Sequence, residues 1–372
     1  MTEKIKRVAV LTGGGDAPGL NGVIRGVVRT AERIYGAEVY GFLDGFKGLI
    51  ENRYILLDRS NTSGILHRGG TILGTSNRDN PFRFPAGRDE EGRLKFRDVS
   101  DQAMANLEAL GIQALIVIGG DGSMHIAQEF AQKGLRVIGV PKTIDNDVNA
   151  TDQTFGFDTA VNTVMEALDR LHTTAESHHR IMVVEVMGRY AGWIALHSGM
   201  AGGADVILIP EIPYDIEVIA EKIKHRCRQG KHFSMVTVAE GAVEKAGEMV
   251  VAARIEDSTD PIRLGGVGQV VADKLARATG LESRATVLGH LQRGGSPTAF
   301  DRILTTRLGV RAMEAAAEGP WSQMAALKGT EITMVPIRDA IDNLKVIDRK
   351  SEIIHAAKAI GICFGDEYDE KR

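Results

Sequence analysis

The sequence predicts an α/β fold of two doubly wound lobes with mainly parallel sheets. Short apolar runs alternate with segments that carry apolar residues at helical spacing, and this alternation is typical of β-α-β units and parallel sheets. The runs are too many for one small sheet, and 372 residues are enough for about two domains of ordinary size. Two segments rich in glycine and aspartate follow predicted strands, at the strand ends where open parallel sheets bind ligands.

Eight apolar runs are predicted to be buried strands, at residues 8–11, 39–42, 114–118, 137–140, 181–186, 206–209, 233–239 and 285–288. Helical spacing predicts helices at residues 19–32, 102–110, 123–132, 158–174, 216–229 and 258–279. We expect Asp158 to be the N-cap of a helix that crosses between lobes, with the lobe boundary near residues 155–160. Residues 79–98 mix proline, glycine and charge and are expected to form an exposed excursion, and the charged tail 366–372 is expected to fray.

The composition narrows the classes of partner and the compartment. The net charge of −4 provides no basic field for nucleic acid or a membrane surface, so we expect neither as a partner. Cys227 and Cys363 are the only cysteines, which favours a reducing, cytoplasmic setting over a disulfide framework or a thiolate metal site. The sequence has no signal-peptide pattern and no apolar stretch of about 18 residues, so we expect a protein that is neither exported nor membrane-spanning.

The loop LTGGGDAPGLN at residues 11–21 joins the first predicted strand to the first predicted helix. Its backbone N–H groups can meet an anion at a helix N-terminus, a geometry that suits a nucleotide phosphate. The loop matches neither the GxGxxG dinucleotide fingerprint nor the Gly-Lys-Ser/Thr of a P-loop, so neither of those mechanisms transfers directly. A tight turn built on glycine is the alternative interpretation.

The two glycine- and aspartate-rich segments together predict a phosphoryl-transfer site. GGDGS at residues 119–123 offers adjacent glycines for the close approach of phosphate oxygens and one carboxylate, Asp121, that can coordinate Mg²⁺. PKTIDND at residues 141–147 has Thr143, Asp145 and Asp147 at alternating positions, so an extended segment would aim all three the same way. A capped turn and an Asx-turn are the structural alternatives for the two loops taken singly.

Cationic side chains occur in three further strand-end contexts, SHHR at 177–180, MGR at 187–189 and GHLQRGG at 289–295. An anionic second substrate needs such groups, because arginine binds phosphate through two hydrogen bonds and stays charged. Taken singly, each arginine is more typical of a surface or an interface. His178 and His179 are adjacent and would point apart on a strand, so they do not predict a metal site.

Six motifs in order resemble the 6-phosphofructokinase family: LTGGGDAPGLN, RGGTILGT, IGGDGS, PKTIDND, VVEVMGRYAGW and TVLGHLQRGGSP. The resemblance runs from about residue 7 to about residue 310. It implies two Rossmann-like lobes with the active site in the cleft between them. The implied phosphoryl-donor lobe comprises residues 1–157 plus about 294–345, and the implied sugar lobe comprises residues 158–293 plus about 346–372.

The resemblance also implies a reaction and roles for its residues. ATP would phosphorylate fructose 6-phosphate at the C1 hydroxyl, giving fructose 1,6-bisphosphate and ADP in glycolysis. Asp145 would be the general base, while Thr143 and Asp147 would position the sugar and the metal. Asp121 would hold Mg²⁺. The phosphoryl donor would bind Gly15, Gly120, Asp121, Gly122 and Ser123.

Further arginines follow from the same resemblance. The family has a phosphate-bridging arginine at a position that is Asn77 here, and we expect Arg78 to take that role through a shifted loop. Arg180 and Arg284 match arginines that reach the 6-phosphate from a neighbouring subunit, so a homotetramer, or a homodimer, with shared sites is implied. Sugar-phosphate contacts within the chain are implied for Met187, Gly188, Arg189, Glu240, His290 and Arg293.

Two positions bear on the identity of the phosphoryl donor, and they disagree. In the family, a glycine at the position of Gly122 leaves room for the α-phosphate of ATP, whereas the pyrophosphate-dependent branch has aspartate there. The position of Lys142 is glycine in typical bacterial ATP enzymes and lysine in the pyrophosphate branch. A lysine near the phosphates does not exclude ATP and can stabilise transition-state charge, so we predict ATP, with pyrophosphate as the alternative.

Regulation and catalytic competence are two further questions that the residues address. Arg25, Arg29 and Arg59 match a regulatory pocket for ADP or phosphoenolpyruvate, whereas His172 and a shortened stretch at 230–232 depart from it. The alternative for Arg25 and Arg29, which lie one turn apart on a predicted helix, is that they face solvent or a subunit interface.

A catalytically silent sensor of sugar phosphates or nucleotides is the alternative function of another class. The retained carboxylates at 121, 145 and 147 argue against it.

Overall fold

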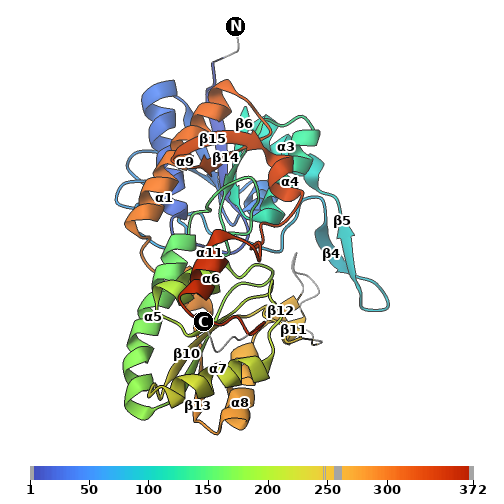
Figure 1. The fold of residues 1–372 in the computed structure, drawn as a ribbon. Helices are drawn as coiled ribbons and strands as arrows, with labels where there is room; N and C mark the ends of the chain where they lie inside the picture. Colours follow the sequence, from blue (N-terminus) through green and yellow to red (C-terminus); the bar gives the residue numbers. More distant parts are fainter. Residues whose placement is uncertain (1–3, 246, 248, 255–261, 368–372) are drawn as a thin grey trace.

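The computed structural model describes residues 4–245, 247, 249–254 and 262–367, which form two α/β lobes (Figure 1). One lobe is built on a seven-stranded sheet and the other on a four-stranded sheet. Two short antiparallel hairpins stand outside these sheets. The two doubly wound lobes predicted from the alternation of apolar runs and helical segments are confirmed.

The larger sheet has the strand order β15-β14-β7-β6-β1-β2-β3. Its central strands are parallel, and each edge strand is antiparallel to its neighbour. Every residue of β6 is buried, as expected for a continuous apolar run between two helical layers. The strands are β1 (Arg7–Thr12), β2 (Glu38–Phe42), β3 (Tyr54–Leu57), β6 (Ala114–Gly119), β7 (Val137–Pro141), β14 (Gln323–Lys328) and β15 (Glu331–Pro336).

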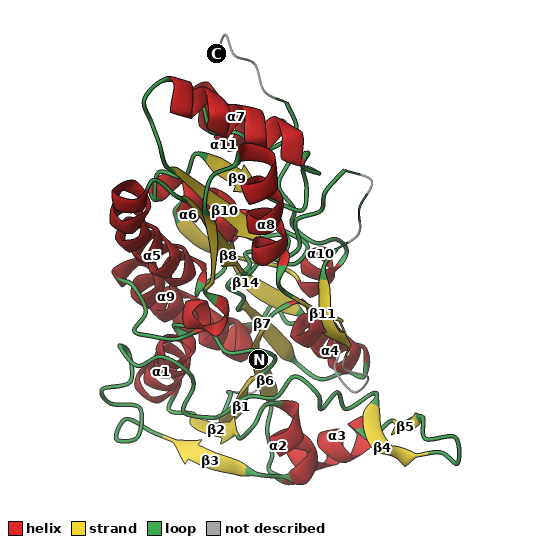
Figure 2. Cartoon of the chain, turned by 90° about the horizontal axis from the view of Figure 1, so that it is seen from below, coloured by secondary structure: helices red, strands yellow, loops and turns green. Residues whose placement is uncertain are grey.

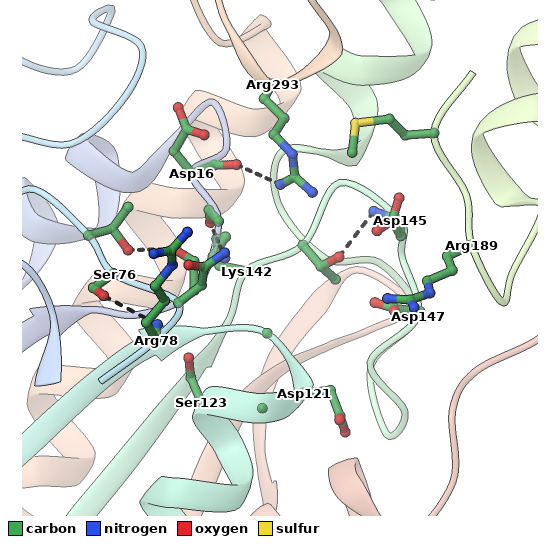
Figure 3. A pocket seen from close by; sticks show the side chains of 18 of the residues that line it. Asp16, Ser76, Arg78, Asp121, Ser123, Lys142, Asp145, Asp147, Arg189 and Arg293 are labelled. Carbon is green, nitrogen blue, oxygen red and sulfur yellow. Dashed lines mark hydrogen bonds between the residues drawn. The ribbon is translucent and has the colours of Figure 1, made fainter. Parts of the chain in front are cut away.

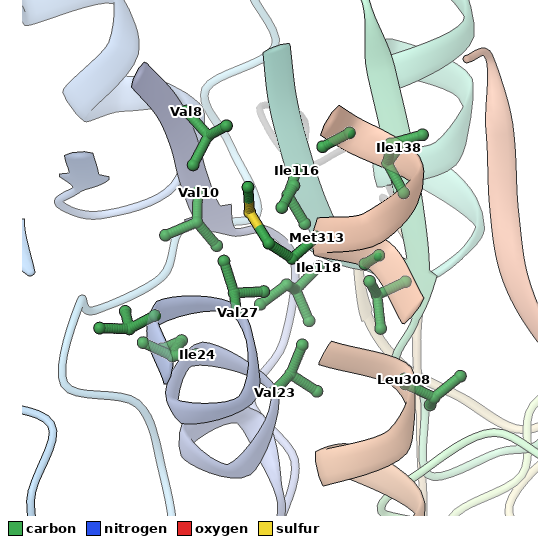
Figure 4. Packing of buried hydrophobic residues seen from close by; sticks show 14 of the residues in the cluster. Val8, Val10, Val23, Ile24, Val27, Ile116, Ile118, Ile138, Leu308 and Met313 are labelled. Carbon is green, nitrogen blue, oxygen red and sulfur yellow. The ribbon is translucent and has the colours of Figure 1, made fainter. Parts of the chain in front are cut away.

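Helices cover both faces of the larger sheet, because its side chains alternate between two apolar layers. α1 (Leu20–Thr30) and α9 (Ala299–Glu318) pack on one face, against alternate residues such as Val8 and Val10 (Figure 4). A Cβ added to Gly26 of α1 would lie 3.1 Å from Cα of Gly309 in α9, so these two helices approach closely only through glycine. The opposite face carries α2 (Phe46–Glu51), α3 (Ser100–Ala109), α4 (Asp121–Gln132) and α10 (Ile337–Ile341).

The smaller sheet has the order β13-β8-β10-β9 and is entirely parallel (Figure 2). Its strands are β8 (Ile181–Val186), β9 (Val206–Leu208), β10 (Ser234–Ala239) and β13 (Ser283–Val287). One face packs on α5 (Phe157–His178), α6 (Trp193–Ala201) and α11 (Glu352–Ala359). The other packs on α7 (Ile216–Arg228) and α8 (Val267–Thr279), and the short η2 (Gly289–Arg293) follows β13. All eight predicted strands are present in the two sheets.

Three expectations about local structure need correction or refinement. Helix α5 begins one residue before Asp158, and Gly156 is its N-cap. The side chain that satisfies the free N–H groups there is Asp301 of α9, whose carboxylate accepts hydrogen bonds from Gly156 N at 3.0 Å and Thr159 N at 2.9 Å. Asp158 instead accepts a hydrogen bond from the Thr298 hydroxyl at 2.6 Å.

The exposed excursion at 79–98 contains a hairpin, β4 (Phe84–Arg88) and β5 (Leu94–Arg97), which projects from the larger lobe (Figure 1). The helix predicted over 258–279 begins only at Val267, because residues 262–264 form β12 (Ile262–Leu264), paired with β11 (Val251–Arg254). Residues 258–261 of that prediction, and 368–372 of the predicted fraying tail, lie outside the described residues. Within the described part of the chain, no helix combines the length and the apolar character needed to cross a membrane.

Candidate functional site

A cavity of about 740 Å³ lies between the two lobes and collects most of the predicted site residues (Figure 3). The larger lobe contributes the loops after β1, β6 and β7, and the smaller lobe contributes the loops after β8, β10 and β13. The cavity is lined by the predicted residues Gly15, Arg78, Gly120, Asp121, Gly122, Ser123, Lys142, Thr143, Asp145, Asp147, Met187, Arg189, Glu240, His290 and Arg293. We call the segments 13–16 and 119–123, which reach the cavity through residues 14–16 and 120–123, the glycine side, and the part formed by Asp145, Asp147 and Glu240 the carboxylate side.

Backbone packing explains why the glycine side is made of glycine. Gly13 N donates to Ile118 O at 2.9 Å, so the loop after β1 lies against the end of β6. A Cβ added to Gly119 would lie 2.2 Å from Cβ of Ser123, which leaves no room for any other residue there. Gly122 differs, because a Cβ added to it would meet no atom within 4 Å. Its open surface faces the cavity at the first turn of α4, where free N–H groups favour an anion.

Two cations reach the glycine side and are held by its carbonyl groups (Figure 3). Lys142 is 4% exposed, and its Nζ donates a hydrogen bond to Gly15 O. Burial, with a further contribution from Arg293, lowers the pKa of Lys142 to about 7. Arg293 Nη1 donates to Asp16 O at 3.0 Å, and a Cβ added to Gly15 would lie 2.8 Å from the same nitrogen. The loop after β1 therefore anchors one cation from each lobe.

The loop after β7 brings Asp145 and Asp147 into the cavity, although it is not uniformly extended. Asn146 has φ 53° and is 4% exposed, so the chain turns between the two carboxylates. Asp145 N donates to the Thr143 hydroxyl at 3.1 Å. The expectation that both carboxylates face the site is met through this turn rather than through strand alternation.

Asp145 carries a buried oxygen that the described residues leave without a hydrogen-bond partner, its Oδ1. Burial raises the pKa of Asp145, and the nearby cations Arg293, Lys142 and Arg189 oppose that rise. Burial and the neighbouring Asp145 also raise the pKa of Asp147. A buried acceptor with no protein partner is costly, so this oxygen is arranged for a group that enters from outside.

The smaller lobe supplies the rest of the carboxylate side. Burial, followed by repulsion from Asp145, raises the pKa of Glu240 to about 7. Met187 N donates to the Gln292 side chain at 3.2 Å, which joins the loops after β8 and β13. Gly188 does not line the cavity, but it has φ 130° and its carbonyl accepts from Gly241 N at 3.1 Å. Gly188 therefore shapes the turn that presents its two neighbours.

Arg180 and Arg284 do not line this cavity. Both form ion pairs with Glu282, through Nε at 2.8 Å in the case of Arg180. The expectation that they serve a neighbouring subunit's site stays a prediction. The proposed regulatory residues also stay untested: Arg29 has a buried Nε without a hydrogen-bond partner among the described residues, while His172 Nε2 lies 2.9 Å from Gly202 O.

Several lining residues were not predicted from the sequence. Asp16 sits in a motif that was recognised, so its position beside Gly15 was the available signal. The apolar side chains in the wall of the cavity are those of Phe46, Ile126 and Leu264, and nothing in their local sequence distinguishes them from core residues. Asn77 and Arg78 both line the cavity, beside Thr75, Ser76, Asp79 and Asn80.

The donor set of the cavity fits Mg²⁺ bound together with phosphates. Across the described residues, no cluster of three or more His, Cys, Asp or Glu side chains is arranged to hold a metal by itself. Mg²⁺ commonly uses one or two carboxylates and completes its shell with water and substrate phosphates. Asp121 provides such a carboxylate among the residues that line the cavity, and burial raises its pKa.

Comparison with known proteins points to one family. The family model described as Phosphofructokinase matches residues 7–316. "ATP-dependent 6-phosphofructokinase 2" of Clostridium perfringens is 54% identical over 367 residues, covering 98% of this chain and 100% of that protein. "Pyrophosphate--fructose 6-phosphate 1-phosphotransferase" of Streptomyces coelicolor is 51% identical over 343 residues, covering 92% of this chain and 96% of that protein. Phosphofructokinase from Saccharomyces cerevisiae matches in structure with a TM-score of 0.77 and 33% identity, over 91% of this chain and 45% of the longer yeast chain.

Proposed function

The chain belongs to the phosphofructokinase family, and we propose that it catalyses the ATP-dependent phosphorylation of fructose 6-phosphate at the C1 hydroxyl. The products are fructose 1,6-bisphosphate and ADP, and the reaction is a step of glycolysis. The observation that carries this proposal is the buried Oδ1 of Asp145 in the cavity, for which the described residues offer no hydrogen-bond partner. A sugar hydroxyl is the kind of donor that this oxygen lacks.

In the proposed mechanism the donor phosphates bind the glycine side and the sugar binds the carboxylate side. Asp145 accepts the proton of the C1 hydroxyl as that oxygen attacks the γ-phosphoryl group. Its raised pKa suits this task, because a base works best when its pKa approaches the working pH. Thr143 hydrogen-bonds the backbone of Asp145 and thereby fixes the direction of the carboxylate.

Charge on the transferring group is met by cations and backbone N–H groups. Gly15 and the Gly120–Ser123 stretch present backbone to the phosphates, with Arg78 and Lys142 at the same side of the cavity. Arg293 joins this side to the sugar loops, since it is tied to Asp16 O. Met187, Arg189, Glu240 and His290 are proposed to hold the sugar phosphate.

We propose that Mg²⁺ is held by Asp121, with Asp147 nearby in the same cavity. The ion supplies charge neutralisation at the phosphoryl oxygens when it is bound. The protein would provide one carboxylate at a helix N-terminus and leave the remaining coordination to phosphate and water.

ATP is the proposed donor because Gly122 leaves its part of the cavity open and Lys142 is already bound to Gly15 O. The names of the relatives favour ATP, since an ATP-dependent enzyme is 54% identical to this chain and a pyrophosphate-dependent one 51%. The test is a coupled assay of fructose 1,6-bisphosphate formation with ATP and with pyrophosphate at equal concentrations. We expect turnover with ATP, and turnover with pyrophosphate alone would overturn the choice of donor.

The wider organisation is proposed on the same basis. The donor lobe comprises residues 1–157 plus about 294–345, in keeping with β14 and β15 in the larger sheet. The sugar lobe comprises residues 158–293 plus about 346–372, in keeping with α11 on the smaller sheet.

We propose a cytoplasmic homotetramer, or homodimer, in which Arg180 and Arg284 complete a neighbouring site. Light scattering gives the oligomeric state. Recovery of activity on mixing Arg284→Ala with Asp145→Asn subunits tests the shared site, because one wild-type site then forms from two defective chains.

A further inference from the structure

The segment around Lys345 crosses from the larger lobe to the smaller one and touches the loop that carries Asp145 and Asp147. Lys345 N donates to Asp147 O at 2.9 Å. Two residues later, Ile347 N donates to Glu211 Oε1 at 3.0 Å, and the same carboxylate oxygen accepts from Gly192 N at 3.0 Å. The crossing segment is thus bonded to the loop after β7 in one lobe and to the start of α6 in the other.

The side chain of Lys345 makes the most specific contact of this crossing. Its Nζ donates to Asn146 Oδ1 at 3.1 Å and to Asp152 O. The ammonium also lies 5.3 Å from the centre of the Trp193 ring, while Trp193 Nε1 donates to Lys345 O at 2.8 Å. A half-buried lysine held by two oxygens and an aromatic face is fixed in place, in contrast to the usual solvated lysine.

Asn146 is the residue between the two site carboxylates, and it is not among the residues that line the cavity. It has φ 53° and is 4% exposed, and its Oδ1 also accepts from Thr154 N at 3.0 Å. Asparagine tolerates the left-handed region better than most residues, but that tolerance alone does not fix a single conformation. The Thr154 hydroxyl donates to the same oxygen at 3.4 Å, and these three hydrogen bonds to Oδ1 hold the turn on which the direction of both carboxylates depends.

We propose that Lys345 is a positioning residue, which holds Asp145 and Asp147 in their reactive arrangement through Asn146 and the Asp147 backbone. The inference rests on the proposed function, because it assigns a role in the same reaction to a residue that touches no substrate. Misplacing a reacting group by about 1 Å can cost about 100-fold in rate. Loss of the Lys345 side chain should therefore lower kcat and leave substrate binding nearly intact.

The test is Lys345→Met, which keeps the apolar stem and the backbone hydrogen bonds and removes the ammonium. We expect kcat to fall about 10- to 100-fold, with KM for fructose 6-phosphate and for ATP changed by less than about threefold. Lys328→Met is the matched control, because Lys328 Nζ lies 3.6 Å from Asp152 Oδ1 and is 47% exposed. It removes a charge from the same neighbourhood without contact to Asn146, so its kcat should equal that of the wild type.

Two further variants separate positioning from a merely structural role. Lys345→Arg keeps a cationic donor and should recover most of the lost kcat. Asn146→Ala should lower kcat, and its combination with Lys345→Met should lower kcat no further than the more severe single change, since both act through one contact. An unchanged kcat in Lys345→Met would overturn the inference, as would a loss of activity that tracks a lowered melting temperature and is not recovered by arginine. Failure of the proposed function has a different signature, because the wild-type protein would then form no fructose 1,6-bisphosphate in the same assay.

Discussion

The glycine side of the cavity has open space at Gly122, where another residue would place its side chain, whereas the carboxylate side crowds ionisable groups together. A Cβ added to Gly122 would meet no atom of the described residues within 4 Å, and the neighbours of Gly122 present backbone groups to the cavity. Across the cavity, burial raises the pKa values of Asp145, Asp147 and Glu240, and these groups also act on one another. One side is therefore sensitive to volume and the other to the state of protonation.

This difference teaches where each kind of selectivity resides. Backbone N–H groups bind any phosphate chain that fits, so the glycine side chooses its ligand by the space it leaves. A carboxylate with a raised pKa changes charge within the accessible pH range, so the carboxylate side controls whether the reaction proceeds. A variant that removes charge from the carboxylate side should therefore change kcat. A variant that adds charge to the glycine side should change kcat/KM for the phosphoryl donor.

The largest expected effect comes from removing the charge of the carboxylate side with Asp145→Asn. We expect kcat to fall by about 1,000-fold, within the range that a general base contributes. Stability should be unchanged or raised, because asparagine replaces a buried oxygen that has no hydrogen-bond partner among the described residues and whose pKa is raised by burial. Steady-state kinetics and thermal melting measure the two effects, and Asp339→Asn on the surface is the control. A kcat within about tenfold of the wild type would remove Asp145 from the role of base.

The next effect comes from filling the open space of the glycine side with Gly122→Asp. The added carboxylate should lower kcat/KM for ATP by at least about 100-fold, since close like charges cost several kcal/mol. Folding should be unaffected, because an added Cβ meets open space and an acidic residue is favourable in the first turn of α4.

Gly122→Ala is the matched control for this variant. It makes the same backbone substitution without the charge, and it should retain most ATP turnover. If Gly122→Asp used ATP as well as Gly122→Ala does, the space beside residue 122 would not be the determinant of the donor.

The smallest effect links the two sides through pH. Asp145 acts as a base only when it is ionised, so kcat should decline as pH falls through its raised pKa. The midpoint of this acidic limb of the pH profile should lie above the usual aspartate pKa of about 4. Lys142 is protonated below its pKa of about 7 and holds the Asp145 pKa down. Lys142→Met should therefore move the acidic limb to higher pH by about one unit. A pH profile normalised to each enzyme's maximum measures the shift, and a limb that does not move would separate Lys142 from the base.

The sequence predicted the parts of the fold that bury continuous apolar runs. β1 and β6 were found because both faces of these strands are covered. The edge strand β3 and the hairpin β4–β5 were missed because their residues are largely exposed or half-buried, so no apolar run marks them. Helix α9 was missed although it packs on the larger sheet, since aspartate, threonine, glycine and alanine stand among the leucine and methionine residues of its buried face.

The candidate site was predictable where its residues are chemically distinctive and adjacent in the chain. The loops at 119–123 and 141–147 meet at one cavity because their strands are neighbours in one sheet. The conformation of Asn146 was not predictable, since it depends on Lys345, which lies 199 residues away. The cap of α5 was predicted wrongly for the same reason, because Asp301 reaches it from a helix 142 residues further on.

Asp301 has a mechanical consequence for the whole molecule. Its carboxylate, on a helix of the larger lobe, accepts hydrogen bonds from Gly156 N, Thr159 N and the Thr159 hydroxyl at the start of α5, the helix that packs on the smaller sheet, and its side chain is fully buried. Any rotation of one lobe relative to the other that keeps these hydrogen bonds must use this contact as its hinge. The displacement of an atom then grows with its distance from the hinge, so a small rotation moves the part of the cavity farthest from Asp301 the most.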